Sequence, residues 1–122
     1  MKILEIKKNK KQFISLLLLA DEQESMVDRY LEKGTMYVLE DGEIKAECVV
    51  TDEGGGILEI KNIAVNPSEQ RKGYCRKLIE FLVRKYAGYY SILQVGTGDS
   101  PLTIPFYEKC GFVRSHTVLI FL

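Results

Sequence analysis

The stretch Leu58–Leu82, LEIKNIAVNPSEQRKGYCRKLIEFL, determines the fold that we predict for this chain. Its first part is rich in apolar and β-branched residues and predicts a strand, which ends at Asn66-Pro67-Ser68 because proline has no N–H to give to a sheet. Apolar residues then recur at about 3.6-residue spacing from Tyr74 to Tyr86, with charged residues between them, which predicts an amphipathic helix. The stretch therefore predicts a strand–turn–helix unit.

A basic corner that contains a glycine, Gln70–Arg76, joins the turn to the helix. The first N–H groups of a helix lack intrahelical acceptors and lie at the positive end of the helix dipole. Arg71, Lys72 and Arg76 add positive charge, and Gly73 lets a ligand approach the backbone closely. The corner suits a pyrophosphate, and a solvated basic helix start is the alternative. It is neither a Walker loop nor a GxGxxG fingerprint.

Together with the strand Ile63-Ala64-Val65, the run Gln70-Arg71-Lys72-Gly73-Tyr74-Cys75 resembles motif A of the GNAT family of acetyl-CoA-dependent N-acetyltransferases. That motif is written Q/R-x-x-G-x-G/A, and this chain departs from it at Cys75, where the family has glycine or alanine. A second block, Phe106-Tyr107-Glu108-Lys109-Cys110-Gly111-Phe112, resembles the family's later FYxKxGF signature. Two blocks in this order are more specific than either alone.

Composition and charge narrow the classes of function. The chain has 122 residues, of which 46% are hydrophobic and 28% charged, as expected for one ordinary globular domain. Seventeen basic and seventeen acidic residues cancel, so no overall field favours nucleic acid or a membrane surface. Three widely spaced cysteines indicate neither a zinc site nor a disulfide framework, and reduced thiols favour a cytoplasmic location. The N-terminus lacks a signal-peptide core, and Phe13–Ala20 is too short to span a bilayer.

The patterns along the chain predict an α+β domain with a mixed, mostly antiparallel sheet and flanking helices, in the order β-α-α-β-β-β-α-β-α-β. Strands are expected at Lys2–Ile6, Thr35–Glu40, Glu43–Thr51, Ile57–Val65, Tyr89–Val95 and Phe112–Leu122. Helices are expected at Lys10–Ala20 with Asn9 as its cap, at Glu22–Lys33, from Tyr74 to Tyr86, and at Ser100–Cys110 with a regular part that begins near Ile104. Asp41-Gly42 predicts a tight hairpin, and the loop Gly96–Asp99 follows the carboxyl end of a parallel strand, where crevices bind ligands.

The resemblance implies that a primary amine attacks the thioester of acetyl-CoA, with no metal involved. It implies that the strand formed by Ile63, Ala64 and Val65 holds the pantetheine arm, and that the phosphates are bound by Gln70, Arg71, Lys72, Gly73, Tyr74, Cys75 and Arg76. Tyr107 occupies the family's usual general-acid position, and packing against the sheet is the alternative role for this tyrosine. The two N-terminal helices are implied to wall the acceptor side.

Glu59 is the candidate general base, because its strand is expected to face the crevice. Strict alternation places Glu59 and Lys61 on the face of Ile63 and Val65, unless a bulge resets the register. A neighbouring lysine would keep Glu59 ionised and weaken it as a base, so solvated pairing is the alternative.

The C-terminal segment departs most from the family, because GNAT domains usually add a further strand after it. We therefore expect a single domain over residues 1–122 that lacks the usual final strand. The run Val118–Leu122 is apolar almost throughout, and a long apolar edge strand favours pairing with another chain. A homodimer through this segment is predicted, and folding back onto the chain's own sheet is the alternative.

Two other functions fit the same patterns. One is a CoA-binding domain with weak or no catalysis, which would release no thiol with any amine. The other is a phosphate- or nucleotide-binding regulatory module, which would bind ATP-like ligands at least as tightly as CoA.

Overall fold

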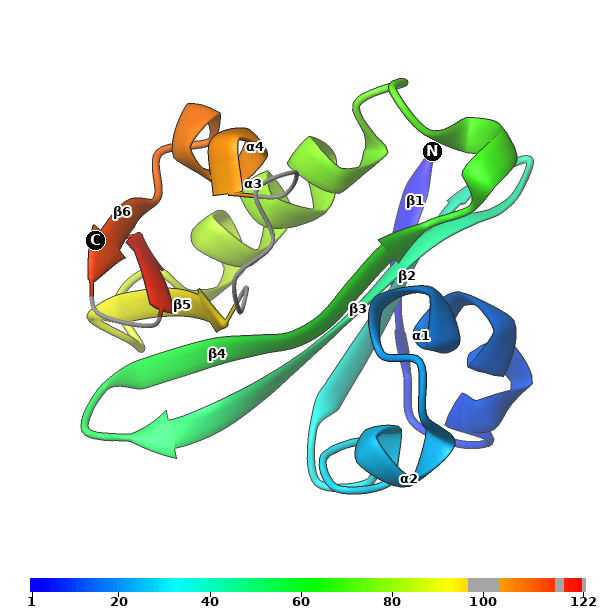
Figure 1. The fold of residues 1–122 in the computed structure, drawn as a ribbon, viewed down its shortest axis with the longest axis horizontal. Helices are drawn as coiled ribbons and strands as arrows, with labels where there is room; N and C mark the ends of the chain where they lie inside the picture. The colour runs from blue at the N-terminus through cyan, green and yellow to red at the C-terminus, as the bar shows by residue number, and fades with distance from the viewer. Residues whose placement is uncertain (97–103, 116–117, 122) are drawn as a thin grey trace.

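The computed structural model describes residues 1–96, 104–115 and 118–121, which form one seven-stranded sheet with helices on both faces (Figure 1). The strands are β1 (Lys2–Ile6), β2 (Thr35–Asp41), β3 (Glu43–Gly54), β4 (Ile57–Val65), β5 (Ile92–Gly96), β6 (Val113–Ser115) and β7 (Val118–Phe121). The helices are the 3-10 turns η1 (Lys10–Phe13) and η2 (Pro67–Glu69) and the α-helices α1 (Ile14–Ala20), α2 (Glu24–Val27), α3 (Tyr74–Tyr86) and α4 (Ile104–Lys109). The predicted α+β class is confirmed.

The strand order is β1-β2-β3-β4-β5-β7-β6, and among these described strands only β4 and β5 are parallel neighbours. The first four strands form an antiparallel meander, in which Gly42, with φ +80°, makes the predicted Asp41-Gly42 hairpin. The parallel pair requires a crossover, and α3 supplies it. The sheet is therefore mixed and mostly antiparallel, as predicted.

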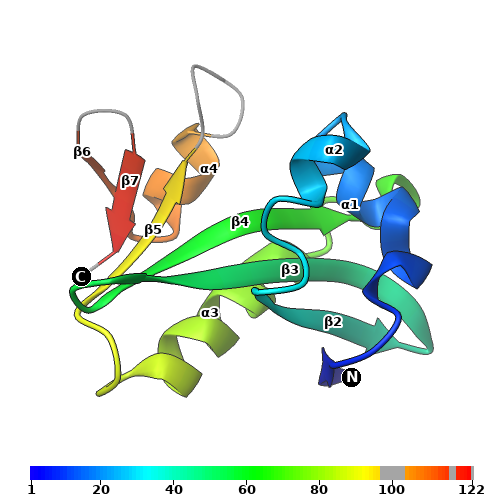
Figure 2. The ribbon, with the colours of Figure 1, turned by 90° about the horizontal axis from the view of Figure 1, so that it is seen from below.

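Two apolar cores lie on opposite faces of the sheet. Figure 2 shows α1 and α2 above the sheet and α3 below it. The core under α3 contains Leu78 and Leu82 of that helix together with Cys48 and Ile60 of the sheet. The core under α1 and α2 contains Leu17, Val27 and their sheet neighbours. The alternating side chains of the central strands supply both cores.

The N-terminal helices are shorter than predicted. Residues 10–20 form η1 followed by α1, and Asn9, with φ +51°, makes no side-chain cap. Of the predicted helix Glu22–Lys33 only α2 is α-helical, and turns follow it. The Lys10 side chain is buried, and its ammonium donates hydrogen bonds to the carbonyls of Leu31 and Gly34, both at 2.8 Å. These bonds are made by the turns that follow α2, where the longer helix was predicted. That long-range contact is not visible in the local pattern.

The predicted final strand is wrong as a single element, because the segment forms two strands. β7 pairs antiparallel with both β5 and β6, so it lies inside the sheet and not at its edge. This interior position explains why the run is apolar. The segment folds back onto the chain's own sheet, which was the alternative to a homodimer. The predicted helix Ser100–Cys110 is described from Ile104, where its regular part was expected to begin, and the predicted loop after Gly96 lies outside the described residues.

No helix in the described part of the chain is long and apolar enough to cross a membrane.

Candidate active site

The central feature of the sheet is the point at which β4 and β5 separate. Their parallel pairing runs from Ile57 with Ile92 to Ile60 with Val95. Beyond that point β4 continues to Val65, while β5 ends at Gly96. The last part of β4 therefore has no strand partner on its β5 side among the described residues. Such a separation of parallel neighbours is where ligands usually bind in sheets of this kind.

A cleft of about 890 Å³ begins at this separation. It is lined by Ile60–Val65 of β4; by Gln70, Arg71, Gly73, Tyr74, Cys75 and Arg76 of the basic corner; by Val95, Gly96 and Tyr107; and by Leu19, Ala20 and Glu22 from the end of α1. Ten of the twelve residues proposed from the sequence thus line one cleft. The two that do not are Lys72 and Glu59.

A bulge in β4 shapes the wall of the cleft. Val50 of β3 pairs with Ile60, but the adjacent Val49 pairs with Asn62, so Lys61 is an extra residue in the strand. The bulge resets the alternation, so Ile60 and Ile63 both pack on the α3 side. The prediction that Glu59 shares the face of Ile63 is therefore wrong. The cause is a bulge, the one exception to strict alternation that was named from the sequence.

The corner at the start of α3 can bind an anion. Gly73 is the residue before the helix and has φ +84°, a conformation that favours glycine, and no atom within 4 Å would meet a Cβ there. The first N–H groups of α3 have no intrahelical acceptor. Arg71 and Arg76 both line the cleft and make no hydrogen bond or ion pair within the described part of the chain. Both guanidinium groups are thus available to a phosphate.

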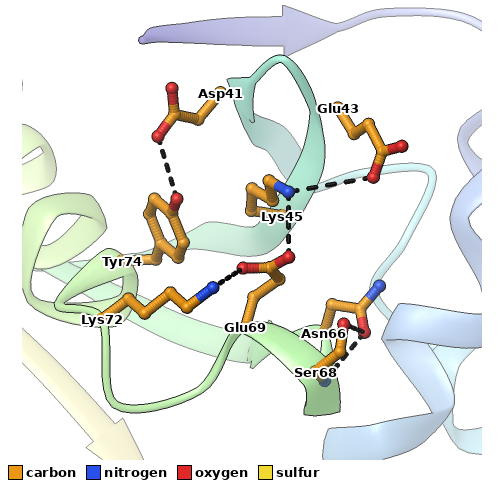
Figure 3. A network of polar contacts seen from close by, with 8 residues as sticks. All are labelled: Asp41, Glu43, Lys45, Asn66, Ser68, Glu69, Lys72 and Tyr74. Atoms are coloured by element: carbon orange, nitrogen blue, oxygen red, sulfur yellow. Dashed lines mark hydrogen bonds and ion pairs between the residues drawn. The ribbon is translucent and has the colours of Figure 1, made fainter.

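Lys72 has a different role from its neighbours. Figure 3 shows its ammonium directed at Glu69, at 2.6 Å, while Lys45 approaches the same carboxylate from β3 at 3.0 Å. The bonds from Lys72 and Lys45 lower the pKa of Glu69. Lys72 therefore fixes the turn before the corner, and the structure does not place it among the cleft residues.

Two ionisable groups lie deep in the cleft. Tyr107 of α4 is 7% exposed, and its ring contacts Phe112 edge to face at 5.5 Å between centroids. Burial raises the pKa of the Tyr107 phenol far above its ordinary value, so the phenol keeps its proton at neutral pH. Burial likewise raises the pKa of the Cys75 thiol to about 12, which makes this cysteine a poor nucleophile.

Glu59 lies on the opposite face of the sheet from the α3 core. Its two oxygens are occupied, one by the ammonium of Lys61 at 2.6 Å and the other by the amide of Gln94 at 2.6 Å. The structure therefore shows Glu59 paired with Lys61, which was the alternative to a role as general base. A carboxylate held by two donors outside the cleft lining is poorly placed to accept a proton there.

The acceptor side of the cleft contains residues that the residue patterns did not single out. Leu19, Ala20 and Glu22 contribute from the N-terminal region, which only the family resemblance had implied. Asn62 is 2% exposed, and its amide donates to the Leu17 carbonyl at 2.9 Å and to the Tyr30 hydroxyl at 3.0 Å. The sequence signal that could have revealed it is weak, because Asn62 is the third polar residue of its strand, after Glu59 and Lys61.

Comparisons with known proteins agree with this geometry. The family model described as an acetyltransferase (GNAT) domain matches residues 32–114. The uncharacterized N-acetyltransferase YvbK of Bacillus subtilis (strain 168) is 36% identical over 104 residues, which cover 83% of this chain and 67% of YvbK.

Solved structures extend the likeness to ligand-bound proteins. A GNAT family acetyltransferase from Elizabethkingia anophelis with acetyl-CoA bound has a TM-score of 0.87 and 25% identity, covering 98% of this chain and 96% of that one. A Bacillus subtilis acetyltransferase in complex with CoA has a TM-score of 0.84 and 33% identity, covering 92% and 76%.

Proposed function

Since this chain belongs to the GNAT family and is an N-acetyltransferase of the acyltransferase class, we propose that it transfers the acetyl group of acetyl-CoA to a primary amine. Residues 1–122 form the single N-acetyltransferase domain of this proposal. A cytoplasmic location, expected from the free thiols, stays a prediction.

The observation that carries the proposal is that the cleft has a basic, anion-binding corner at one end and, among the described residues, an unpaired strand edge leading away from it. At one end lie the Gly73 corner and Arg71 and Arg76, which have no partner among the described residues and suit the pyrophosphate of acetyl-CoA. From there the edge of β4 at Ile63–Val65 leads toward Tyr107, and this edge can bind the pantetheine amides as another strand would.

The chemistry requires few protein groups. The neutral amine attacks the thioester carbonyl carbon, a C–N bond forms, and the C–S bond breaks. A backbone N–H on the unpaired edge of β4 can polarise the carbonyl. Tyr107 gives its proton to the leaving thiolate, and the nitrogen loses one proton as the amide forms, which restores the phenol by way of solvent. The high pKa of this phenol opposes the transfer, but the same apolar surroundings also raise the proton affinity of the thiolate.

The base is not Glu59 in this proposal, because Lys61 and Gln94 hold both of its oxygens. The ammonium of the substrate instead loses its proton to solvent at the mouth of the cleft. Glu59→Gln is therefore expected to keep a rate close to wild type, and steady-state kinetics of thiol release check this. A loss of about a hundredfold, within the range for general acid–base groups, would restore Glu59 as the base.

The test of the proposed function uses two glycines of similar conformation. Gly73 has φ +84° and Gly88 has φ +87°, and neither has an atom within 4 Å of where a Cβ would lie. Only Gly73 lines the cleft. Gly73→Val should weaken acetyl-CoA binding strongly in calorimetry, whereas Gly88→Val carries the same backbone strain and should leave the affinity close to wild type.

Three results would contradict the proposal. Equal acetyl-CoA affinities in the two glycine variants would show that the Gly73 corner does not bind the phosphates. Acetyl-CoA binding without thiol release across a panel of amines would favour a CoA-binding domain without catalysis. ATP binding at least as tight as CoA binding would favour a nucleotide-binding regulatory module.

A further inference from the structure

The acceptor end of the cleft lies opposite the arginine corner. Leu19, Ala20 and Glu22 line it from the end of α1, and Lys61 and Asn62 line it from β4. This end differs from the phosphate end in its charge and in how its wall is held in place.

Buried hydrogen bonds fix this wall to the sheet. Asn62 donates both of its amide hydrogens, one to the Leu17 carbonyl of α1 and one to the Tyr30 hydroxyl. The Tyr30 hydroxyl in turn donates to Asp21 at 3.2 Å. Asp21 directly precedes Glu22, so the position of Glu22 at the cleft depends on contacts that reach β4. These contacts hold the backbone next to Glu22 at the cleft, and the Glu22 side chain is exposed there.

The charges at this end do not cancel. The ammonium of Lys61 lies 2.6 Å from Glu59 and 3.9 Å from Glu53, so two carboxylates already neutralise it. Glu22 makes no hydrogen bond or ion pair with any described residue. Glu24, two positions further on, is bound to Lys11 at 2.8 Å and does not line the cleft. Among the described residues that line the cleft, Glu22 is the carboxylate at this end without a paired cation.

That carboxylate does not suit the reacting nitrogen, which must be neutral to attack, because a nearby negative charge would favour the ammonium form. Reaction takes place beside the buried Tyr107, whereas Glu22 is exposed at the rim. On the basis of the proposed function, we propose that the acceptor amine carries a second cationic group and that Glu22 binds it, which makes Glu22 a specificity-determining residue for diamine-like acceptors.

The test compares 1,4-diaminobutane with butylamine, which have the same carbon chain but differ in the second ammonium group. Wild type should have a higher kcat/KM for the diamine. In Glu22→Gln the diamine-to-monoamine ratio of kcat/KM should fall about fivefold, as expected for a partly solvated ion pair, and Glu22→Lys should lower it further. Glu24→Gln removes the same charge outside the cleft and should leave the ratio unchanged. Salt should reduce the wild-type preference.

Two outcomes would overturn the inference. One is a ratio that Glu22→Gln leaves unchanged, or that Glu24→Gln lowers as much. The other is an equal fall in kcat for both amines, which would make Glu22 a proton acceptor. Calorimetry with acetyl-CoA separates the two levels of the proposal: a wild-type chain that does not bind acetyl-CoA overturns the proposed function as well, whereas normal binding with no preference between the amines overturns this inference alone.

Discussion

Two tyrosines line the cleft, and their hydroxyl groups have different surroundings. The hydroxyl of Tyr74 donates to Asp41 on β2 at 2.9 Å (Figure 3), while Tyr107 lies deep beside β4 and β5. If Tyr107 is the general acid, Tyr107→Phe should lower kcat about tenfold or more with little change in acetyl-CoA affinity. Tyr74→Phe also removes a hydroxyl from a cleft tyrosine and serves as the control. Equal rates in the two variants would leave Tyr107 as a packing residue.

A second residue, Glu47, matters for stability. It lies on β3 between Val38 and Ala64, is 0% exposed, and neither carboxylate oxygen has a hydrogen-bond partner among the described residues. Burial raises its pKa from 4.5 to about 8. Between these two values the folded chain keeps a proton that the unfolded chain loses, so the free energy of unfolding falls as the pH rises.

We expect the wild type to lose on the order of 4 kcal/mol of stability between pH 5 and pH 8 through this group. Glu47→Gln cannot ionise, so its free energy of unfolding should change much less over the same range. Urea unfolding at several pH values measures both slopes. Glu43→Gln, at an exposed position of the same strand, should keep the wild-type slope. If Glu47→Gln has that slope too, Glu47 is ionised in the folded chain.

At the scale of elements, two adjacent lysines have opposite environments. Lys10 is 8% exposed and its ammonium donates to the carbonyls of Leu31, Glu32 and Gly34. Lys11 is exposed and pairs with acidic side chains of the α2 region. Lys10→Met should destabilise the chain by about 3 kcal/mol, because it leaves buried carbonyls without a donor. Lys11→Met should change stability far less, and equal effects in urea unfolding would contradict the assignment.

The same comparison shows what sequence patterns can and cannot predict. The unit β4–turn–α3 was predicted correctly because strand propensity, Pro67 and the helical period are all local signals. The choice of Lys10 over Lys11 as the buried lysine depends on carbonyls more than twenty residues away in the chain, which no local pattern contains. The bulge at Lys61 likewise arises from pairing with β3, and it moved Glu59 away from its predicted face.

At the scale of the whole molecule, the residues proposed for the site line one cleft where they are contiguous in the sequence. The corner Gln70–Arg76 and the strand Ile63–Val65 both reach the cleft, apart from Lys72. The acceptor wall was not predicted by the patterns, because Leu19 and Glu22 reach the cleft only through the packing of α1 on the sheet. In the proposed function, long-range packing would therefore decide which amine fits, while local motifs would decide where the cosubstrate binds.

The oligomeric state is a property of the whole sheet. The homodimer was predicted because the C-terminal run would form an apolar edge, but β7 is paired on both sides. The edges are instead β1, which carries the charged Lys2 and Glu5, and β6, which has three residues. Charged side chains and short length both disfavour edge-to-edge pairing. Because the apolar strand is paired within its own sheet, we expect a monomer of 13.9 kDa in light scattering at micromolar concentration. Specific activity of such a monomer should also be independent of enzyme concentration. A species of twice that mass, with activity that falls on dilution, would support the dimer.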